Sequence, residues 1–164
     1  MAIEDVRVML EEYIIQNQER FYRLAYSHVG NKDGALDVVQ NAVVKGLENC
    51  GSIRRPEFIK TWFFRVLLNE CYGYLRKTGR EISVEPIVLQ QLRDEGTEER
   101  DEREIYEQVL KLPDKMRTVI ILRFYEEFSL EEISRATGSG LGAVKYRLYA
   151  GLKELKRMCE EESI

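Results

Sequence analysis

The stretch SLEEISRATGSGLGAVKYRLYAGLKEL, residues 129 to 155, carries the clearest structural pattern in the chain. Ser129 and Glu132 form a capping box, in which the serine hydroxyl accepts a first-turn amide and the glutamate carboxylate accepts the serine amide. The helix that starts there is predicted to end at Gly138, because glycine readily adopts the left-handed conformation of a helix stop. A further helical pattern follows, so the stretch predicts two helices joined by a tight turn.

The second of these helices has an apolar side and a basic side. Its predicted buried side consists of Leu141, Val144, Leu148, Leu152 and Leu155. Its outward side holds Gly142, Ala143, Tyr146, Ala150 and Arg157, flanked by Lys145, Arg147, Tyr149 and Lys153. Small residues let a helix approach a phosphate backbone, and bases and tyrosines can reach base edges in a major groove. The helix is therefore a candidate for DNA binding, with a merely solvated basic face as the alternative.

Charge is distributed unevenly along the 164 residues, which carry a net charge of -4. Residues 81–104 hold nine acidic and three basic residues. By contrast, residues 54–80 hold seven basic and two acidic residues, and residues 139–158 hold five basic residues and one acidic residue. The sequence thus predicts two positive surfaces separated by an acidic segment.

Helical periodicity dominates the sequence, and alternating β-branched strands are absent, so an all-α fold is predicted. The expected helices span about residues 3–29, 34–49, 57–77, 105–112, 116–125, 130–137 and 141–158. On residues 34–49, Leu36, Val39, Val43 and Leu47 are expected to face the core. Residues 78–103 are hydrophilic and contain glycine and proline, so they are interpreted as a linker with one short helical turn at residues 88–92.

The helix predicted at residues 57–77 also has two different sides. Phe63, Phe64, Leu67, Cys71, Tyr74 and Leu75 fall on one side, where core packing is expected. Arg65, Asn69, Tyr72 and Arg76 line the other side, and Trp62 lies at its edge. Arginine, asparagine and tyrosine along one line, with an aromatic ring beside them, are suited to tracking phosphates and stacking on unpaired bases.

Composition excludes several functional classes. Cys50, Cys71 and Cys159 lack the spacing of a metal site or a disulfide framework and are interpreted as reduced. The sequence has neither a phosphate-cradling glycine loop nor a nucleophile with a base, so no enzyme activity, cofactor or metal is predicted. Five acidic residues among the first twenty and the lack of a long apolar run indicate a cytoplasmic protein without membrane insertion.

Two segments resemble those of a known family. Residues 21–49 followed by residues 59–77 resemble the second conserved region of bacterial RNA polymerase sigma factors, and residues 112–148 resemble their fourth. The intervening segment is too short for the third-region domain of larger members. The chain is therefore similar to the extracytoplasmic-function group.

The resemblance implies partners and roles. The family motif Asp-Ala-x-Asp-x-x-Gln corresponds to Asp33, Ala35, Asp37 and Gln40, with one extra residue after Asp33. In the family this helix docks on the polymerase β′ clamp, which implies that Asp37, Gln40, Asn41 and Val44 contact core polymerase. The residues matching the grip on the melted minus-ten element are Trp62, Arg65, Asn69, Tyr72 and Arg76. Those matching the upstream duplex contact are Gly142, Ala143, Lys145, Tyr146, Arg147 and Tyr149.

This sequence departs from the family pattern at several positions. Leu68 and Gly73 stand where many members have arginine and aspartate, so no contact is assigned to them. Ala150 replaces a frequent arginine, which indicates a different base preference or weaker upstream reading. Gly140 replaces the usual serine cap and has no side-chain acceptor.

The sequence as a whole predicts an initiation sigma factor of two small helical domains joined by a flexible acidic linker. The domains are assigned to residues 1–79 and 104–164, and the linker to residues 80–103. Its expected partners are core RNA polymerase (β′ clamp and β flap), promoter DNA and an anti-sigma factor. The alternatives are a helix-turn-helix regulator that works without polymerase, and a helical adaptor that binds only protein.

Overall fold

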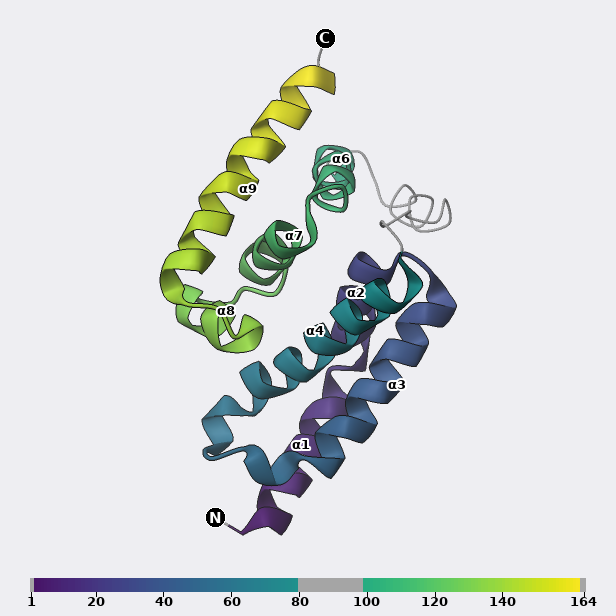
Figure 1. The fold of residues 1–164 in the computed structure, drawn as a ribbon, viewed down its shortest axis with the longest axis vertical. Coiled ribbons are helices and arrows are strands. Elements are labelled where there is room, and N and C mark those ends of the chain that lie inside the picture. Colours follow the sequence, from purple (N-terminus) through teal and green to yellow (C-terminus); the bar gives the residue numbers. More distant parts are fainter. Residues whose placement is uncertain (1, 80–98, 163–164) are drawn as a thin grey trace. The chain divides into compact units, whose positions relative to one another are not determined.

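The computed structural model describes residues 2–79 and 99–162, which form two compact units. Within these residues every regular element is a helix (Figure 1). The all-α prediction is confirmed. The predicted helical turn at residues 88–92, and most of the predicted linker, lie outside the described residues.

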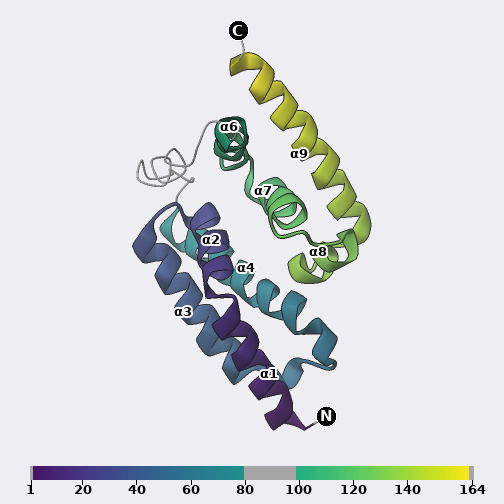
Figure 2. The same ribbon diagram turned by 180° about the vertical axis from the view of Figure 1, so that it is seen from behind.

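The N-terminal unit is built from four α-helices and two short 3-10 turns. They are α1 (Ile3–Gln16), α2 (Gln18–Val29), α3 (Lys32–Glu48), η1 (Cys50–Ser52), η2 (Pro56–Phe58) and α4 (Ile59–Thr78). Helices α3 and α4 pack side by side, and α2 packs against both of them (Figures 1 and 2). Gly30 and Gly79 end α2 and α4 in the left-handed conformation, with φ angles of 82° and 61°.

The single helix predicted for residues 3–29 is wrong, because the chain breaks at Asn17. The Asn17 side chain donates to the carbonyl of Tyr13 at 2.8 Å and accepts from Arg20 Nη1 at 3.2 Å. Asparagine competes with the backbone for hydrogen bonds in this way, which favours a helix end over a helix interior. The break divides the pattern into α1 and α2.

Aromatic side chains form the centre of the N-terminal unit. The Phe21 ring on α2 lies 4.6 Å from Phe63 and 5.5 Å from Phe64 on α4, and all three are fully buried. Leu67 and Cys71 continue the same side of α4 and are also fully buried. Each buried phenylalanine contributes about 1.5–3 kcal/mol. The predicted core side of α4 is therefore confirmed except at Tyr74, which is half-buried, and the opposite side is left to the surface.

The core side predicted for α3 is wrong. The buried residues are the small ones Gly34, Ala35, Val38, Ala42 and Gly46, whereas Leu36 is 46% exposed. Val39, Val43 and Leu47 are only half-buried. A Cβ atom on Gly46 would lie 3.1 Å from the Phe63 ring, so α3 and α4 approach too closely for a large side chain between them. The larger apolar residues of α3 are thereby turned outward.

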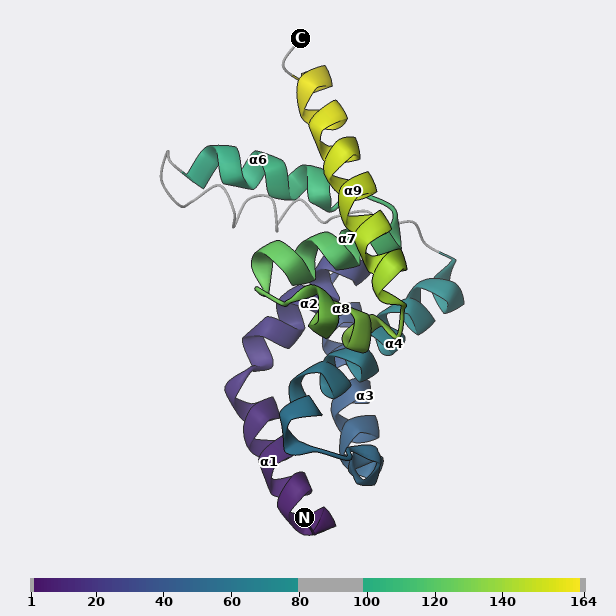
Figure 3. The ribbon, with the colours of Figure 1, turned by 90° about the vertical axis from the view of Figure 1, so that its left-hand side faces the viewer.

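The C-terminal unit consists of α6 (Glu99–Val109), α7 (Asp114–Ile120), the π-turn η3 (Ile121–Tyr125), α8 (Leu130–Thr137) and α9 (Leu141–Glu162). The long helix α9 packs along α7, and the short helix α8 precedes it (Figure 3). Helix α6 begins at Glu99, so residues 99–103, which the sequence assigned to the linker, are helical.

The segment before α8 has both the predicted cap and an unpredicted strain. The Ser129 hydroxyl accepts from the Glu132 amide at 3.1 Å, and the Glu132 carboxylate accepts from the Ser129 amide at 3.0 Å. The capping box is thus confirmed, as is the left-handed stop at Gly138 with φ 68°. Glu127 also has a positive φ, of 59°. A residue with a Cβ atom pays roughly 1–2 kcal/mol in that conformation.

Packing of α9 differs partly from the prediction. Val144, Leu148 and Leu155 are buried as expected, whereas Leu141 and Leu152 are 37% and 38% exposed. The place expected for Leu152 is taken by Gly151, where an added Cβ atom would lie 3.1 Å from Ile120 of α7. Close approach at a glycine thus selects the buried side of α9, as it does for α3.

Candidate nucleic-acid and protein interfaces

A groove of about 1120 Å³ lies between α3 and the α1–α2 segment of the N-terminal unit. It is lined by apolar and aromatic side chains, with a smaller number of polar ones. The apolar and aromatic lining consists of Ile14, Phe21, Tyr22, Leu36, Val39, Val43 and Val44. The polar lining consists of Gln18, Glu19, Arg23, Asp37, Gln40 and Asn41. Such a lining suits a partner segment that offers apolar anchors and complementary charge.

All four residues predicted to bind core polymerase line this groove. Asp37, Gln40 and Asn41 are exposed, and Val44 is 54% exposed. The structure adds the apolar residues beside them, Leu36, Val39 and Val43, which the sequence analysis assigned to the core. Because these three residues were assigned to the core, no groove was predicted from the sequence. The run of small residues on the other side of the helix was the available signal that α3 packs by its small side.

The start of α3 is held by contacts that explain the extra glycine in its motif. The Asn31 side chain accepts from the Gly34 amide at 2.7 Å and donates to the Tyr74 hydroxyl at 3.1 Å. A Cβ atom on Gly34 would lie 2.6 Å from both the Tyr74 hydroxyl and Val29. Glycine is therefore favoured where the helix start meets Tyr74, and this close contact contributes to the packing of α3 against α4.

The polar side of α4 carries most of the residues predicted for the melted downstream element. Arg65, Asn69 and Arg76 are exposed on it. Tyr72 is half-buried, with its ring 5.9 Å from the ring of the fully buried His28. Trp62 is half-buried beside Gly46. The structure thus places the three polar residues on one surface and gives Tyr72 and Trp62 packing partners as well.

Ion pairs change the charge that the α4 surface presents. Glu70 on α4 pairs with Lys45, which α3 supplies. Glu57 lies 3.8 Å from Arg55 in the preceding loop. Lys45 lies outside the basic segment 54–80 and adds one positive charge beside α4, whereas Arg55 belongs to that segment and its pair with Glu57 leaves the net charge of the segment unchanged. The surface of α4 is more positive than its own sequence indicates.

The outward side of α9 carries the residues predicted for the upstream duplex. Tyr146 and Tyr149 are 70% and 67% exposed, and Gly142, Ala143 and Lys145 are exposed as well. Arg147 differs from them, because it is half-buried and donates to the Ser139 hydroxyl at 2.7 Å. Lysine and tyrosine therefore form the outer surface of the helix, and one predicted contact residue is engaged within the unit.

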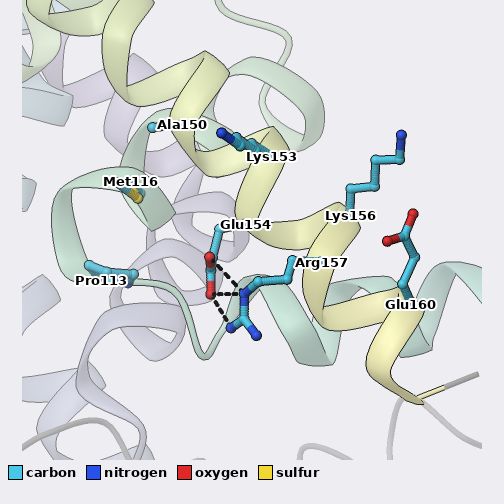
Figure 4. A pocket seen from close by; sticks show the side chains of 8 residues that line it. All are labelled: Pro113, Met116, Ala150, Lys153, Glu154, Lys156, Arg157 and Glu160. Atoms are coloured by element: carbon cyan, nitrogen blue, oxygen red, sulfur yellow. Dashed lines mark hydrogen bonds and ion pairs between the residues drawn. The ribbon is translucent and has the colours of Figure 1, made fainter. Parts of the chain in front are cut away.

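A second hollow, of about 640 Å³, lies where the C-terminal half of α9 meets the start of α7 (Figure 4). Pro113, Met116 and Ala150 line it together with Lys153, Glu154, Lys156, Arg157 and Glu160. Figure 4 shows the Arg157 guanidinium against the Glu154 carboxylate, and Arg157 also pairs with Glu161. The hydrogen bond from Arg157 lowers the pKa of the Glu154 carboxyl. No pattern in the sequence indicated this hollow.

The described residues offer little support for a metal site or a membrane span. No cluster of three or more potential ligands there is arranged to hold a metal ion. Cys50, Cys71 and Cys159 are free cysteines. None of the described helices combines the length and apolar character that a membrane span requires.

Comparison with known sequences identifies the family. The family model described as "Sigma-70 region 2" matches residues 14–81, and the one described as "Sigma-70, region 4" matches residues 102–155. The RNA polymerase sigma factor SigV of Bacillus subtilis is 34% identical over 161 residues, which are 98% of this chain and 97% of that protein. The ECF RNA polymerase sigma factor SigW of the same species is 28% identical, over 88% of this chain and 85% of its own length. The chain belongs to the sigma-70 family.

Solved structures share the fold. The sigma factor RpoE in complex with the anti-sigma factor NepR from Bartonella quintana matches with a TM-score of 0.71 and 22% identity, over 92% of this chain and 96% of that one. CnrH in complex with the cytosolic domain of CnrY matches with a TM-score of 0.69 and 19% identity, over 93% and 88%. Together with the sequence relatives, the fold defines a sigma factor of the extracytoplasmic-function group that directs promoter recognition and transcription initiation.

Proposed function

We propose that this sigma factor binds core RNA polymerase through the groove between α3 and the α1–α2 segment. The observation that carries the proposal is that Asp37, Gln40, Asn41 and Val44 all line this groove, beside the apolar Leu36, Val39 and Val43. In the family the corresponding helix docks on the β′ clamp. The apolar lining would hold the anchors of a clamp segment, while Asp37 and Glu19 favour a basic residue on it.

Promoter DNA is assigned to two other surfaces. The exposed side of α4, with Arg65, Asn69 and Arg76, would hold the downstream element once it melts, and Trp62 and Tyr72 would supply rings for stacking. The outer side of α9, with Lys145, Tyr146 and Tyr149, would read the upstream element as duplex. The β flap is the expected polymerase partner of the C-terminal unit.

The remaining assignments follow from this mechanism. The protein would act by binding and positioning, without catalytic chemistry of its own, and in the cytoplasm where polymerase works. The domains expected from the sequence are residues 1–79 and 104–164, joined by residues 80–103; because α6 begins at Glu99, the second domain would start there. An anti-sigma factor is a further expected partner, since the structurally similar RpoE was solved with the anti-sigma factor NepR.

Charge reversal in the groove tests the proposal. Asp37→Lys combined with Gln40→Ala should weaken binding to core polymerase on the order of ten-fold, because it places a positive charge where the partner is expected to be basic. Glu48→Lys is the matched control, since Glu48 is an exposed acid on α3 that does not line the groove. Affinity is measured by titrating fluorescently labelled protein with core enzyme.

Two outcomes would contradict the proposal. The first is unchanged core affinity of the double variant while its helical circular dichroism matches the wild type. The second is tight, sequence-specific binding of promoter duplex by the protein alone, which a polymerase-independent regulator would show. A helical adaptor would instead bind no DNA even with polymerase present.

A further inference from the structure

The turn between α8 and α9 is held by hydrogen bonds that converge on Ser139. The Ser139 amide donates to the Ser134 carbonyl at 3.2 Å, and the Ser134 hydroxyl donates to the Ser139 carbonyl at 2.6 Å. Arg147 Nη1, two turns into α9, donates to the Ser139 hydroxyl at 2.7 Å. The backbone and the side chain of Ser139 are thus both engaged, one with each helix.

The sequence of the turn explains why such bonds matter. Gly138 has a φ of 68°, and Gly140 immediately precedes α9, so a glycine lies on each side of Ser139. Glycines leave a backbone more conformational freedom than other residues do. Gly140 also offers no side-chain oxygen to cap α9. The charge-assisted bond from Arg147 supplies a restraint that the turn residues themselves lack.

Arg147 differs in this respect from its neighbours on α9. Lys145, Tyr146 and Tyr149 are exposed, whereas Arg147 is half-buried with its guanidinium directed to the turn. A side chain held at the turn is placed to fix the start of α9 relative to α8. The start of α9 sets the direction of the whole helix. That direction determines where the exposed lysine and tyrosines meet a groove of the DNA.

We propose that Ser134, Ser139 and Arg147 are positioning residues for upstream recognition, and that they set the approach of α9 to the duplex while other side chains read it. The inference rests on the proposed function of α9. It revises the role expected for Arg147 from the sequence, and it assigns roles to two serines that the sequence analysis did not single out.

The test is a double-mutant cycle in the holoenzyme. Wild-type holoenzyme selects a preferred sequence from a duplex library randomised in the upstream element, and variants are then titrated with that duplex. Ser139→Ala and Arg147→Ala should each lower affinity about five-fold, and the double variant should lose no more than either, because both changes remove one bond. The salt dependence should stay unchanged, since no phosphate contact is lost.

Matched variants sharpen the cycle. Ser139→Thr keeps a hydroxyl and should retain most of the affinity. Lys145→Ala, on the exposed side of the helix, combined with Ser139→Ala should lose less affinity than the sum of the two single changes, because Ser139 acts partly by placing Lys145. Repeating the selection with Ser139→Ala should return the wild-type sequence with weaker preference at all its positions, because no single base contact is removed.

Several results would overturn the inference. One is wild-type affinity of Ser139→Ala while Arg147→Ala loses affinity and its salt slope falls by about one, which marks a direct phosphate contact. Another is loss of preference at a single base pair in Arg147→Ala alone, which marks a base reader. If Ser139→Ala fails to fold, Ser134→Ala is tested in its place. Wild-type affinity of Ser134→Ala would then contradict the inference. Failure of the wild-type holoenzyme to select any upstream sequence would contradict the proposed function itself.

Discussion

The helices α4 and α9 are both basic in sequence, yet folding brings an additional base beside α4 and engages bases of α9 in bonds within its own unit. Around α4, Lys45 arrives from α3 and pairs with Glu70, so that surface gains a neutralising base from elsewhere in the chain. On α9, Arg147 is directed to Ser139, and Arg157 pairs with Glu154 and Glu161. Two of the five bases counted in residues 139–158 are therefore engaged within the unit.

The difference teaches that a count of basic residues is not a count of available contacts. The surface of α4 can attract phosphates over most of its length, which suits retention of an unpaired DNA strand by charge and stacking. Surface α9 offers fewer bases and two exposed tyrosines, which suits contact with base edges more than strong backbone attraction. The predictions below test whether this contrast between the two helices holds.

The largest effect is expected on α4. Trp62→Ala should reduce promoter opening by roughly 5- to 150-fold while sparing closed-complex binding, because stacking on an unpaired base contributes about 1–3 kcal/mol. Permanganate reactivity of unpaired thymines in the promoter measures opening. Asn69→Ala is the companion variant, since Asn69 is exposed and its loss leaves the core intact.

A premelted template separates the two helices. It should restore complex formation to the Trp62 and Asn69 variants, which fail in melting, but not to Lys145→Ala on α9, which fails in duplex recognition. If the premelted template rescues both sets equally, or neither set, α4 and α9 do not divide the work as proposed.

A smaller effect is expected on the support of α4. Gly34→Ala should destabilise the N-terminal unit by about 1–2 kcal/mol, because overpacking against Tyr74 and Val29 outweighs the gain in helix propensity. Denaturant unfolding followed by the fluorescence of Trp62, the single tryptophan, reports on this unit. Gly51→Ala is the control, since nothing lies within 4 Å of its added Cβ atom. Equal stability of both variants would mean that Tyr74 moves aside freely.

The smallest effect is expected at Arg157. Because this side chain is paired with two acids, Arg157→Gln should change the salt slope of upstream duplex binding by less than about half a unit, whereas a free phosphate contact accounts for about one. The ion pair between Arg157 and Glu154 depends on pH. Because the pKa of Glu154 is lowered, the pair persists at neutral pH and is lost as the pH falls through that pKa. If Arg157→Gln lowers the salt slope by a full unit, Arg157 contacts the DNA.

Much of the fold was predictable because its signals are local. The capping box at Ser129, the stops at Gly30, Gly79 and Gly138, and the aromatic side of α4 all depend on residues a few positions apart. The break at Asn17 was not predictable from hydrophobicity, because it depends on hydrogen bonds of a polar side chain to Tyr13 and Arg20. The buried side of α3 was not predictable from hydrophobicity either, because the closeness of α3 to Phe63 decides which side of the helix fits. That closeness depends on tertiary packing, which hydrophobic periodicity does not report.

The candidate sites likewise combine residues that the sequence indicated with contacts that depend on tertiary packing. The family resemblance indicated Asp37, Gln40, Asn41 and Val44, but the apolar groove beside them required the positions of α1 and α2. Likewise, the sequence placed Arg147 near the outward side of α9. Its bond to Ser139, eight residues earlier, depends on how the turn folds back.

The left-handed Glu127 before α8 has a consequence for how this protein can change. Either glutamate codon becomes a glycine codon by one transition at its second base, and glycine carries no Cβ penalty at a φ of 59°. Glu127→Gly therefore needs only one nucleotide change. It should stabilise the fold by up to about 1 kcal/mol after the added entropy of the unfolded chain is subtracted. Such a reserve would offset a destabilising substitution elsewhere in the C-terminal unit, including one that alters which promoters are read.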